Sequence, residues 1–285
     1  TLFPYTTLFR SAAGNLVSAL ESAAKDGYLR PVLGAGKTRK TEWKNPKKGI
    51  FGVLQYLSFN STPMGKALAM SLRDALEQSG NAPKISFVDK SGSRYDPKTN
   101  TIYINRAEQS AEVVLHETLH AALQWFVHQN PNHPAVKVLQ NALDRALKAE
   151  GLTGKAKDVQ AVLAKLVKNN RGLDAVLELV SYNATLNEFR KAMQALPSTG
   201  QTAGFRSSLN MVWNALKRLV SVLTGTKPSL ASDILDASMH LLEESQKAEM
   251  PEKMTGKVLD IATTAFRKWF GNSKVVDKDG QPLVV

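Results

Sequence analysis

The chain has 285 residues and carries 37 Lys and Arg against 25 Asp and Glu, so its formal net charge is +12. The length suffices for one large domain or two small ones, and the 43% hydrophobic fraction is that of a globular protein. Because the chain has no cysteine, its composition excludes disulfide scaffolds, thiolate zinc ribbons, iron–sulfur clusters and cysteine nucleophiles, which leaves His and carboxylate groups to hold any metal.

The first sixty residues contain little regular patterning. Residues 1–11 follow neither helical nor strand periodicity and resemble a translated sequencing-adapter peptide, so we expect them to be an artefact. Residues 12–27 predict a short helix. Residues 34–49 are basic and interrupted by glycine and proline, a composition more typical of a solvated linker than of a nucleic-acid contact.

Helical periodicity dominates the rest of the chain. A helix is predicted from Pro63 to Gln78, with Thr62 as its N-cap. Residues 84–88 and 101–105 alternate apolar and polar side chains, so they predict a β-hairpin with one buried face. Further helices are expected over approximately residues 110–128, 134–149, 156–169, 173–195, 204–223, 229–246 and 255–270. The predicted fold class is α+β, mostly helical, with a small hairpin or sheet before the helix that starts near residue 110.

That helix contains the sequence His116-Glu117-Thr118-Leu119-His120, the H-E-x-x-H pattern of zinc peptidases. Residues four apart lie on one face of a helix, so both imidazoles can reach the same zinc ion. Glu117 lies beside that face, where it can act as general base toward a metal-activated water and then protonate the leaving amine. The flanking residues are apolar, so this polar trio would be costly to bury unless something binds it.

A catalytic zinc ion needs a third protein ligand and one open position. We favour Glu178, because it lies among apolar residues in the segment 173–182 and a buried glutamate must be paired or bound to a metal. His133 is the alternative, although Asn132-His133-Pro134 is also typical of a cap followed by a helix that starts with proline. Glu188 is a weaker candidate, which we expect to be an ion-paired surface residue.

These residues resemble the zincin-type metallopeptidase module of large phage polyvalent proteins, over about residues 60–195. The resemblance is carried by the H-E-x-x-H pattern, by the strand Thr101, Ile102, Tyr103, Ile104 and Asn105, and by Glu178-Leu179-Val180-Ser181-Tyr182 with Asn187-Glu188-Phe189. The arrangement of these residues is similar to that of gluzincins, in which a later helix supplies a glutamate ligand. The resemblance implies a zinc-dependent endopeptidase within a phage or prophage polyprotein, with Zn²⁺ as cofactor and a protein or peptide as substrate.

The same resemblance implies roles for two further features. The strand Thr101 to Asn105 is expected to form an exposed sheet edge that pairs with the substrate backbone, a form of β-augmentation. Thermolysin-type gluzincins place an aspartate one turn after the glutamate ligand, whereas this chain has Tyr182 there. Tyr182 either packs in the core, which we favour, or donates a hydrogen bond to an oxyanion.

Residues 273–285 predict a strand, an Asp-Gly turn and a second strand, and they are similar to the opening of the ADP-ribosyltransferase-like domains of phage polyproteins. The Tyr-His-Gly-Thr sequence that follows there is absent, so we assign no transferase activity and expect the chain to be part of a longer protein. The expected organisation is 1–11 artefact, 12–59 N-terminal helix and basic linker, 60–195 zincin-like domain, 196–272 helical extension and 273–285 start of a further domain.

The chain lacks an apolar run of the roughly 18 residues that predict a membrane span, and it shows no recognisable secretion signal. We therefore expect it in the virion or the host cytoplasm, with the other domains of the parent polyprotein as partners. The net charge suits non-specific contact with nucleic acid. The alternative function is a non-catalytic basic module of an ejected virion protein with a relic or structural zinc site. Glu117 favours the peptidase, because a purely structural site does not need it.

Overall fold

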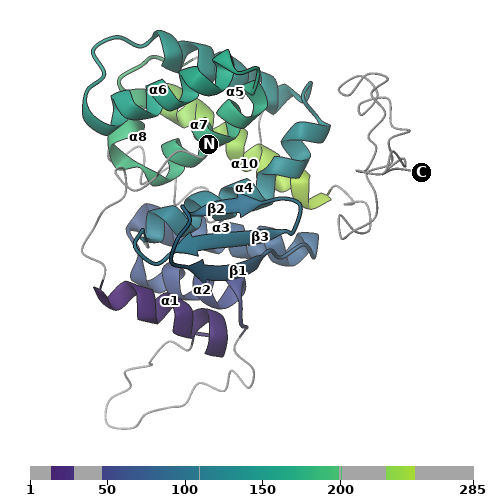
Figure 1. Cartoon of the computed structure of the whole chain (residues 1–285). Helices are drawn as coiled ribbons and strands as arrows, with labels where there is room; N and C mark the ends of the chain where they lie inside the picture. Colours follow the sequence, from purple (N-terminus) through teal and green to yellow (C-terminus); the bar gives the residue numbers. More distant parts are fainter. Residues whose placement is uncertain (1–13, 29–46, 109, 199, 201–228, 248–285) are drawn as a thin grey trace, which may run out of the picture. The chain divides into compact units, whose positions relative to one another are not determined.

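The computed structural model describes residues 14–28, 47–108, 110–198, 200 and 229–247. These residues are mostly helical and include one three-stranded sheet, which confirms the α+β class (Figure 1). The segments 1–11, 204–223, 255–270 and 273–285, for which the sequence carried expectations, lie outside the described residues. None of the described helices is long and apolar enough to span a membrane.

The helices in chain order are α1 (Gly14–Asp26), α2 (Ile50–Asn60), α3 (Pro63–Ser79), α4 (Ala111–Gln129), α5 (Pro134–Lys148), α6 (Gly154–Lys168), α7 (Gly172–Thr185), α8 (Asn187–Gln194) and α10 (Leu230–Lys247). The strands are β1 (Lys84–Val88), β2 (Arg94–Asp96) and β3 (Thr101–Asn105).

Local capping signals define the ends of the two helices nearest the sheet. The Thr62 hydroxyl accepts a hydrogen bond from the Gly65 N–H at 3.1 Å at the start of α3, as predicted. That helix ends at Gly80, whose φ of 65° is readily adopted only by glycine. Ser110 caps α4 in the same way, through the N–H of Val113 at 3.2 Å. The cap at Ser110 sets where the helix with the H-E-x-x-H pattern begins.

Two helical assignments differ from the sequence analysis. Residues 50–59, which the expected organisation placed in the region 12–59 of an N-terminal helix and basic linker, form most of α2, which packs against α1 and α3 with Leu54 and Leu57 buried. Gly52 allows this packing, because a Cβ there would lie 2.0 Å from the Ala23 carbonyl oxygen. Most of the basic stretch 34–49 lies outside the described residues. The single helix expected over 173–195 is two helices, α7 and α8, with Leu186 between them.

The sheet has the order β1-β3-β2, which corrects the predicted hairpin. β1 pairs with β3 in parallel, with Lys84 opposite Thr101, while β2 pairs with β3 antiparallel. Alternation correctly indicated a buried face but could not show which strands pair, since pairing depends on partners elsewhere in the chain. β3 is therefore the central strand and not an exposed edge, so the expected substrate edge at Thr101 to Asn105 is wrong.

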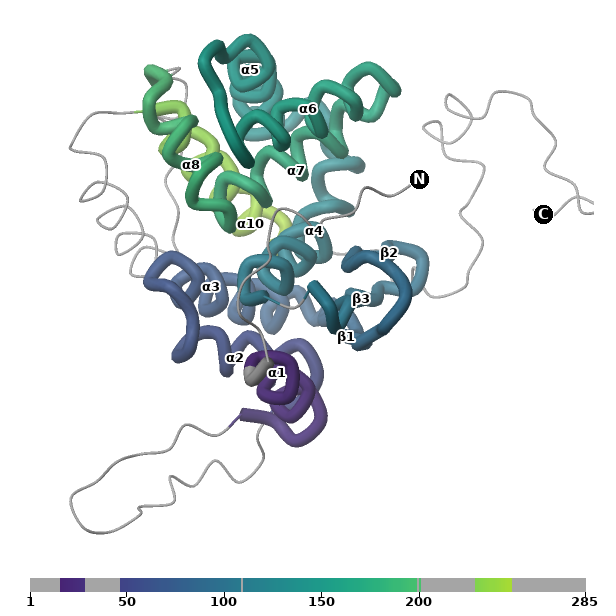
Figure 2. Tube along the Cα trace, turned by 60° about the vertical axis from the view of Figure 1, so that its left-hand side comes forward, coloured from purple at the N-terminus to yellow at the C-terminus, as the bar shows by residue number. Residues whose placement is uncertain are grey.

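α4 is the central helix of the described fold (Figures 1 and 2). It packs against β2, β3 and α3 on one side and against α7 and α10 on the other. α10 also packs against α3, α5, α7 and α8, and its side chains Leu230, Ile234 and Leu241 are fully buried. The described part of the expected extension at 196–272 thus shares the core of the preceding helices, because α10 completes that core.

Candidate metal centre

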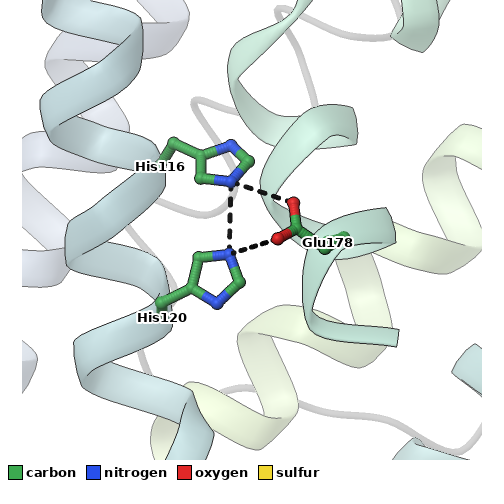
Figure 3. Close-up of side chains that lie close together, drawn as sticks. All are labelled: His116, His120 and Glu178. Carbon is green, nitrogen blue, oxygen red and sulfur yellow. Dashed lines mark hydrogen bonds and ion pairs between the residues drawn. The ribbon is translucent and has the colours of Figure 1, made fainter. Parts of the chain in front are cut away.

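Helices α4 and α7 pack against each other and bring His116, His120 and Glu178 together (Figure 3). The Nε2 atom of His116 lies 3.2 Å from Nε2 of His120 and 3.2 Å from Oε2 of Glu178. The Nε2 atom of His120 lies 3.6 Å from Oε1 of Glu178. Three potential ligand atoms from two helices therefore face one point.

The spacing of these atoms can be compared with that of a zinc site. Zinc bonds of about 2.0–2.1 Å to nitrogen or carboxylate oxygen place neighbouring ligands of a tetrahedral site roughly 3.3 Å apart. The measured separations of 3.2, 3.2 and 3.6 Å are close to this value. Two imidazoles and a carboxylate could therefore hold zinc and leave a fourth position open, as catalytic sites do.

The three side chains are almost enclosed by protein. The exposed fraction is 1% for the side chain of His116 and 12% for those of His120 and Glu178. Leu177 and Leu179, on either side of Glu178, are both buried in the core. The apolar pattern of α7 thus aims one carboxylate into the interface with α4, as the sequence analysis expected.

Opposing effects act on the protonation of this cluster. Burial raises the pKa of the Glu178 carboxyl, but the adjacent imidazoles of His120 and His116 outweigh burial and hold that pKa well below its usual range. Burial lowers the pKa of His120, yet the charge and hydrogen bond of Glu178 raise it overall. Protons would therefore compete with any metal for the imidazole of His120, so low pH would weaken metal binding at this cluster.

Glu117 lies beside the cluster, and its exposed fraction is 3%. Burial raises the pKa of its carboxyl, and the nearby imidazoles of His116 and His120 partly oppose that shift. The backbone of Tyr95 in β2 acts in the same direction as the imidazoles, so this strand lies close to the carboxyl of Glu117. Arg106 donates its N–H to the Val88 carbonyl of β1, and backbone groups alternate along a strand, so the N–H and C=O of Ile102 also face β1. Tyr95 lies opposite Ile102 in a non-hydrogen-bonded pair, and its own N–H and C=O therefore point away from β3.

The sequence analysis missed β2 and its contact with Glu117. The strand has three residues and lies inside a segment rich in turn-forming residues, so its alternation is too short to recognise. The only local signal is the order of polar and aromatic residues in Arg94-Tyr95-Asp96. Its position at the edge of the sheet, next to α4, follows from tertiary packing.

The alternative ligands do not join the cluster. His133 is the N-cap of α5, where its Nδ1 accepts a hydrogen bond from the Ala135 N–H at 3.2 Å. Its ring packs against Phe126 and His240. Glu188 is exposed and accepts a hydrogen bond from the backbone N–H of Lys155 at 3.3 Å. Both residues serve helix ends at a distance from the three candidate ligands.

Tyr182 packs behind the cluster, with an exposed fraction of 1%. Its ring centroid lies 4.8 Å from that of His116 in an edge-on arrangement and 6.4 Å from that of Phe189. Burial raises the pKa of its hydroxyl well above the usual value. The ring thus supports the position of the His116 imidazole, as the packing interpretation expected, and the oxyanion role stays a prediction.

A second histidine–carboxylate pair links the same two helices. Nε2 of His128 in α4 lies 3.0 Å from Oδ1 of Asp174 in α7, and Arg171 donates to the other oxygen of Asp174 at 2.7 Å. Asp174 lies one turn before Glu178, and its charge also raises the pKa of His120. This pair, which the sequence analysis did not identify, holds α7 in register with α4.

Comparisons with protein-family models, with curated proteins and with solved structures found no match for this chain. The resemblance to zincin-type metallopeptidases therefore stays a prediction from the motif and its spacing.

Proposed function

We propose that this protein is a zinc-dependent endopeptidase in which His116, His120 and Glu178 hold the metal and Glu117 is the general base. One observation carries the proposal: three ligand atoms from two helices converge at tetrahedral spacings beside a buried carboxylate that is not part of the ligand set. The phage polyprotein setting, in the virion or host cytoplasm, belongs to the same proposal.

The chain's own residues account for the proton transfers that peptide hydrolysis requires. A bound zinc ion would polarise the scissile carbonyl and make water more acidic. Glu117 accepts the proton from the attacking water and then passes it to the leaving amine. Burial raises the pKa of Glu117, which favours a carboxyl that can both accept and return a proton, and β2 packs against the helix that carries it.

The free edge of β2 is the best candidate for binding the substrate backbone, in place of β3. β2 is the strand at the edge of the sheet that lies against α4, and the C=O of Tyr95 points away from β3. An extended peptide could pair with this edge by β-augmentation. The peptide would then lie beside Glu117, which contacts the same strand.

The variant Glu117→Gln tests the general base. We expect wild type and variant to hold equal amounts of zinc, because Glu117 is not a ligand, and we expect casein cleavage by the variant to fall about 10²- to 10⁴-fold. Zinc is measured by elemental analysis of the full chain. Glu112→Gln, the same substitution in the first turn of the same helix, is the matched control and should retain full activity.

Two results would contradict the proposal. A wild-type chain that holds no zinc would refute the metal centre and its chemistry together. If wild type and Glu117→Gln both hold zinc and neither cleaves casein or a peptide library, the protein is the non-catalytic module with a structural or relic site.

A further inference from the structure

A buried polar cluster lies at one end of the sheet, outside the metal centre. It consists of Glu108, Ser93 and Asn105, with exposed fractions of 7%, 2% and 9%, and we call it the Glu108 clamp. Oε2 of Glu108 accepts a hydrogen bond from the Ser93 N–H at 2.9 Å. The Ser93 hydroxyl accepts one from the Asn105 N–H at 3.0 Å.

The clamp joins the start of β2 to the end of β3. Ser93 immediately precedes β2, and Asn105 is the last residue of β3. The backbone N–H of Glu108 also donates to the Asn105 carbonyl at 2.9 Å, so Glu108 is itself tied to the end of β3. The clamp therefore sets the position of β2 relative to β3.

β2 needs such support because it is short. It pairs with β3 at only three positions, and short edge strands have few ladder bonds to hold their register. Tyr95, two residues after the clamped Ser93, directs its N–H and C=O away from β3, and β2 packs against α4, the helix of Glu117. A shift of β2 along β3 would move these backbone groups relative to Glu117.

Burying the Glu108 carboxylate costs more free energy than burying a neutral hydrogen-bond acceptor would. A buried carboxylate loses more hydration free energy than a neutral amide or hydroxyl group does. Within the described part of the chain, no basic side chain pairs with it, and its side-chain hydrogen bond goes to the Ser93 backbone. A charged acceptor makes this N–H···O bond stronger than a neutral acceptor would. This strength favours a role for Glu108 in holding β2 in position.

We propose that Glu108 is a positioning residue: through Ser93 it holds β2 so that the outward-facing N–H and C=O of Tyr95 stay beside α4, where they face the substrate. The catalytic consequence rests on the proposed endopeptidase function. The structural consequence, a fixed β2 edge, does not depend on it. Loss of the clamp should raise KM, because the docking edge moves, and lower kcat, because the bound peptide shifts relative to Glu117.

Amide hydrogen exchange of the full-length protein, with and without added zinc, tests the structural part. In Glu108→Ala we expect exchange at the Arg94 and Asp96 amides, which face β3, to become about tenfold faster while the amides that join β1 to β3 stay protected. Glu108→Asp keeps the charge but is too short to reach Ser93, so it should show the same local effect if the alanine variant fails to fold. Glu108→Gln retains an acceptor oxygen and should restore most of the protection.

Peptide cleavage by the same variants tests the catalytic part. We expect Glu108→Ala to keep its zinc and lose about tenfold or more in kcat/KM, with Glu108→Gln recovering most of the loss and Glu112→Ala serving as the unaffected control. Unchanged exchange at Arg94 and Asp96, or equally faster exchange throughout the sheet, overturns the proposal. A wild-type chain without zinc or cleavage would instead refute the proposed endopeptidase function. The exchange data alone would then show whether Glu108 holds β2 in position.

Discussion

The Glu178 side chain of α7 contacts both histidines of α4 and so joins the two helices at the candidate metal centre. Its carboxylate oxygens face the imidazoles of His116 and His120 at 3.2 and 3.6 Å, in a nearly enclosed interface. The imidazoles keep this carboxyl ionised despite its burial, so it has the charge state that a metal ligand needs. Its loss would leave two histidines on one helix without the third ligand.

The variant Glu178→Ala should weaken zinc binding about 100-fold. Structural zinc sites bind the ion with roughly 10–16 kcal/mol through about four ligands, so each ligand contributes roughly 3 kcal/mol, or about two factors of ten in affinity. Competition with a chelator of known affinity measures the change. Glu188→Ala, at an exposed position on the neighbouring helix, is the control and should bind zinc as wild type does. Equal affinities of the Glu178 variant and wild type would exclude Glu178 as a ligand.

At the scale of elements, the N-cap of α5 links helix stability to pH. His133 accepts the Ala135 N–H through Nδ1, a bond that requires an unprotonated nitrogen. Partial burial lowers the pKa of His133, the neighbouring His240 lowers it further, and Glu244 acts in the opposite direction. His240 and Glu244 both belong to α10, and the other ring packed on His133, that of Phe126 in α4, is not titratable.

The folded protein should lose stability as His133 becomes protonated. Its folded pKa lies below the unfolded value of about 6.5, so the unfolded chain binds more protons between those two values. Stability should therefore fall as the pH drops from about 6.5 through the folded pKa. His133→Asn keeps an N-cap acceptor and removes the titration, so it should flatten this dependence.

Urea unfolding of metal-free protein at a series of pH values measures the effect of His133. Without zinc, the loss of metal from His116 and His120 at low pH does not contribute, and the difference between wild type and variant isolates His133. Parallel stability curves for the two proteins over the whole range would show that the cap does not titrate.

At the scale of the whole molecule, α10 is part of the same core as the candidate site. Its Ala231 carbonyl accepts a hydrogen bond from the side chain of Asn183 in α7 at 3.2 Å. Asp233 accepts one from Ser198 at 2.8 Å, and the Leu230 N–H donates to the Leu196 carbonyl at 3.0 Å. These bonds join the end of α8 and α10 to the helices that carry the candidate metal ligands.

A chain that ends at residue 198 should not form the metal centre. Burying a large apolar side chain stabilises a fold by about 1.5–3 kcal/mol, and α10 buries several, which together approach the total stability of about 5–15 kcal/mol of a typical domain. We expect the fragment 12–198 to lack a cooperative melting transition and to lose zinc, whereas 12–247 keeps both. Calorimetry and elemental analysis compare them. Zinc bound by a cooperatively folded 12–198 would show that α10 is dispensable.

The local features of this protein were predictable from the sequence. The Thr62 and Ser110 caps, the four-residue spacing of His116 and His120, and the apolar setting of Glu178 depend on residues within one or two helical turns. Such signals act before any long-range contact forms. The sequence therefore determined most helices, their boundaries near the site and the three candidate ligands.

Tertiary structure alone decided the arrangement around that site. The parallel pairing of β1 with β3, the edge position of β2, the packing of β2 against α4 and the docking of α10 all join residues distant in sequence or unpatterned locally. Periodicity tells which face of an element is buried, but it carries no information about the partner that buries it. The candidate ligands could thus be named from the sequence, whereas the strand beside the proposed general base could be found only in the folded chain.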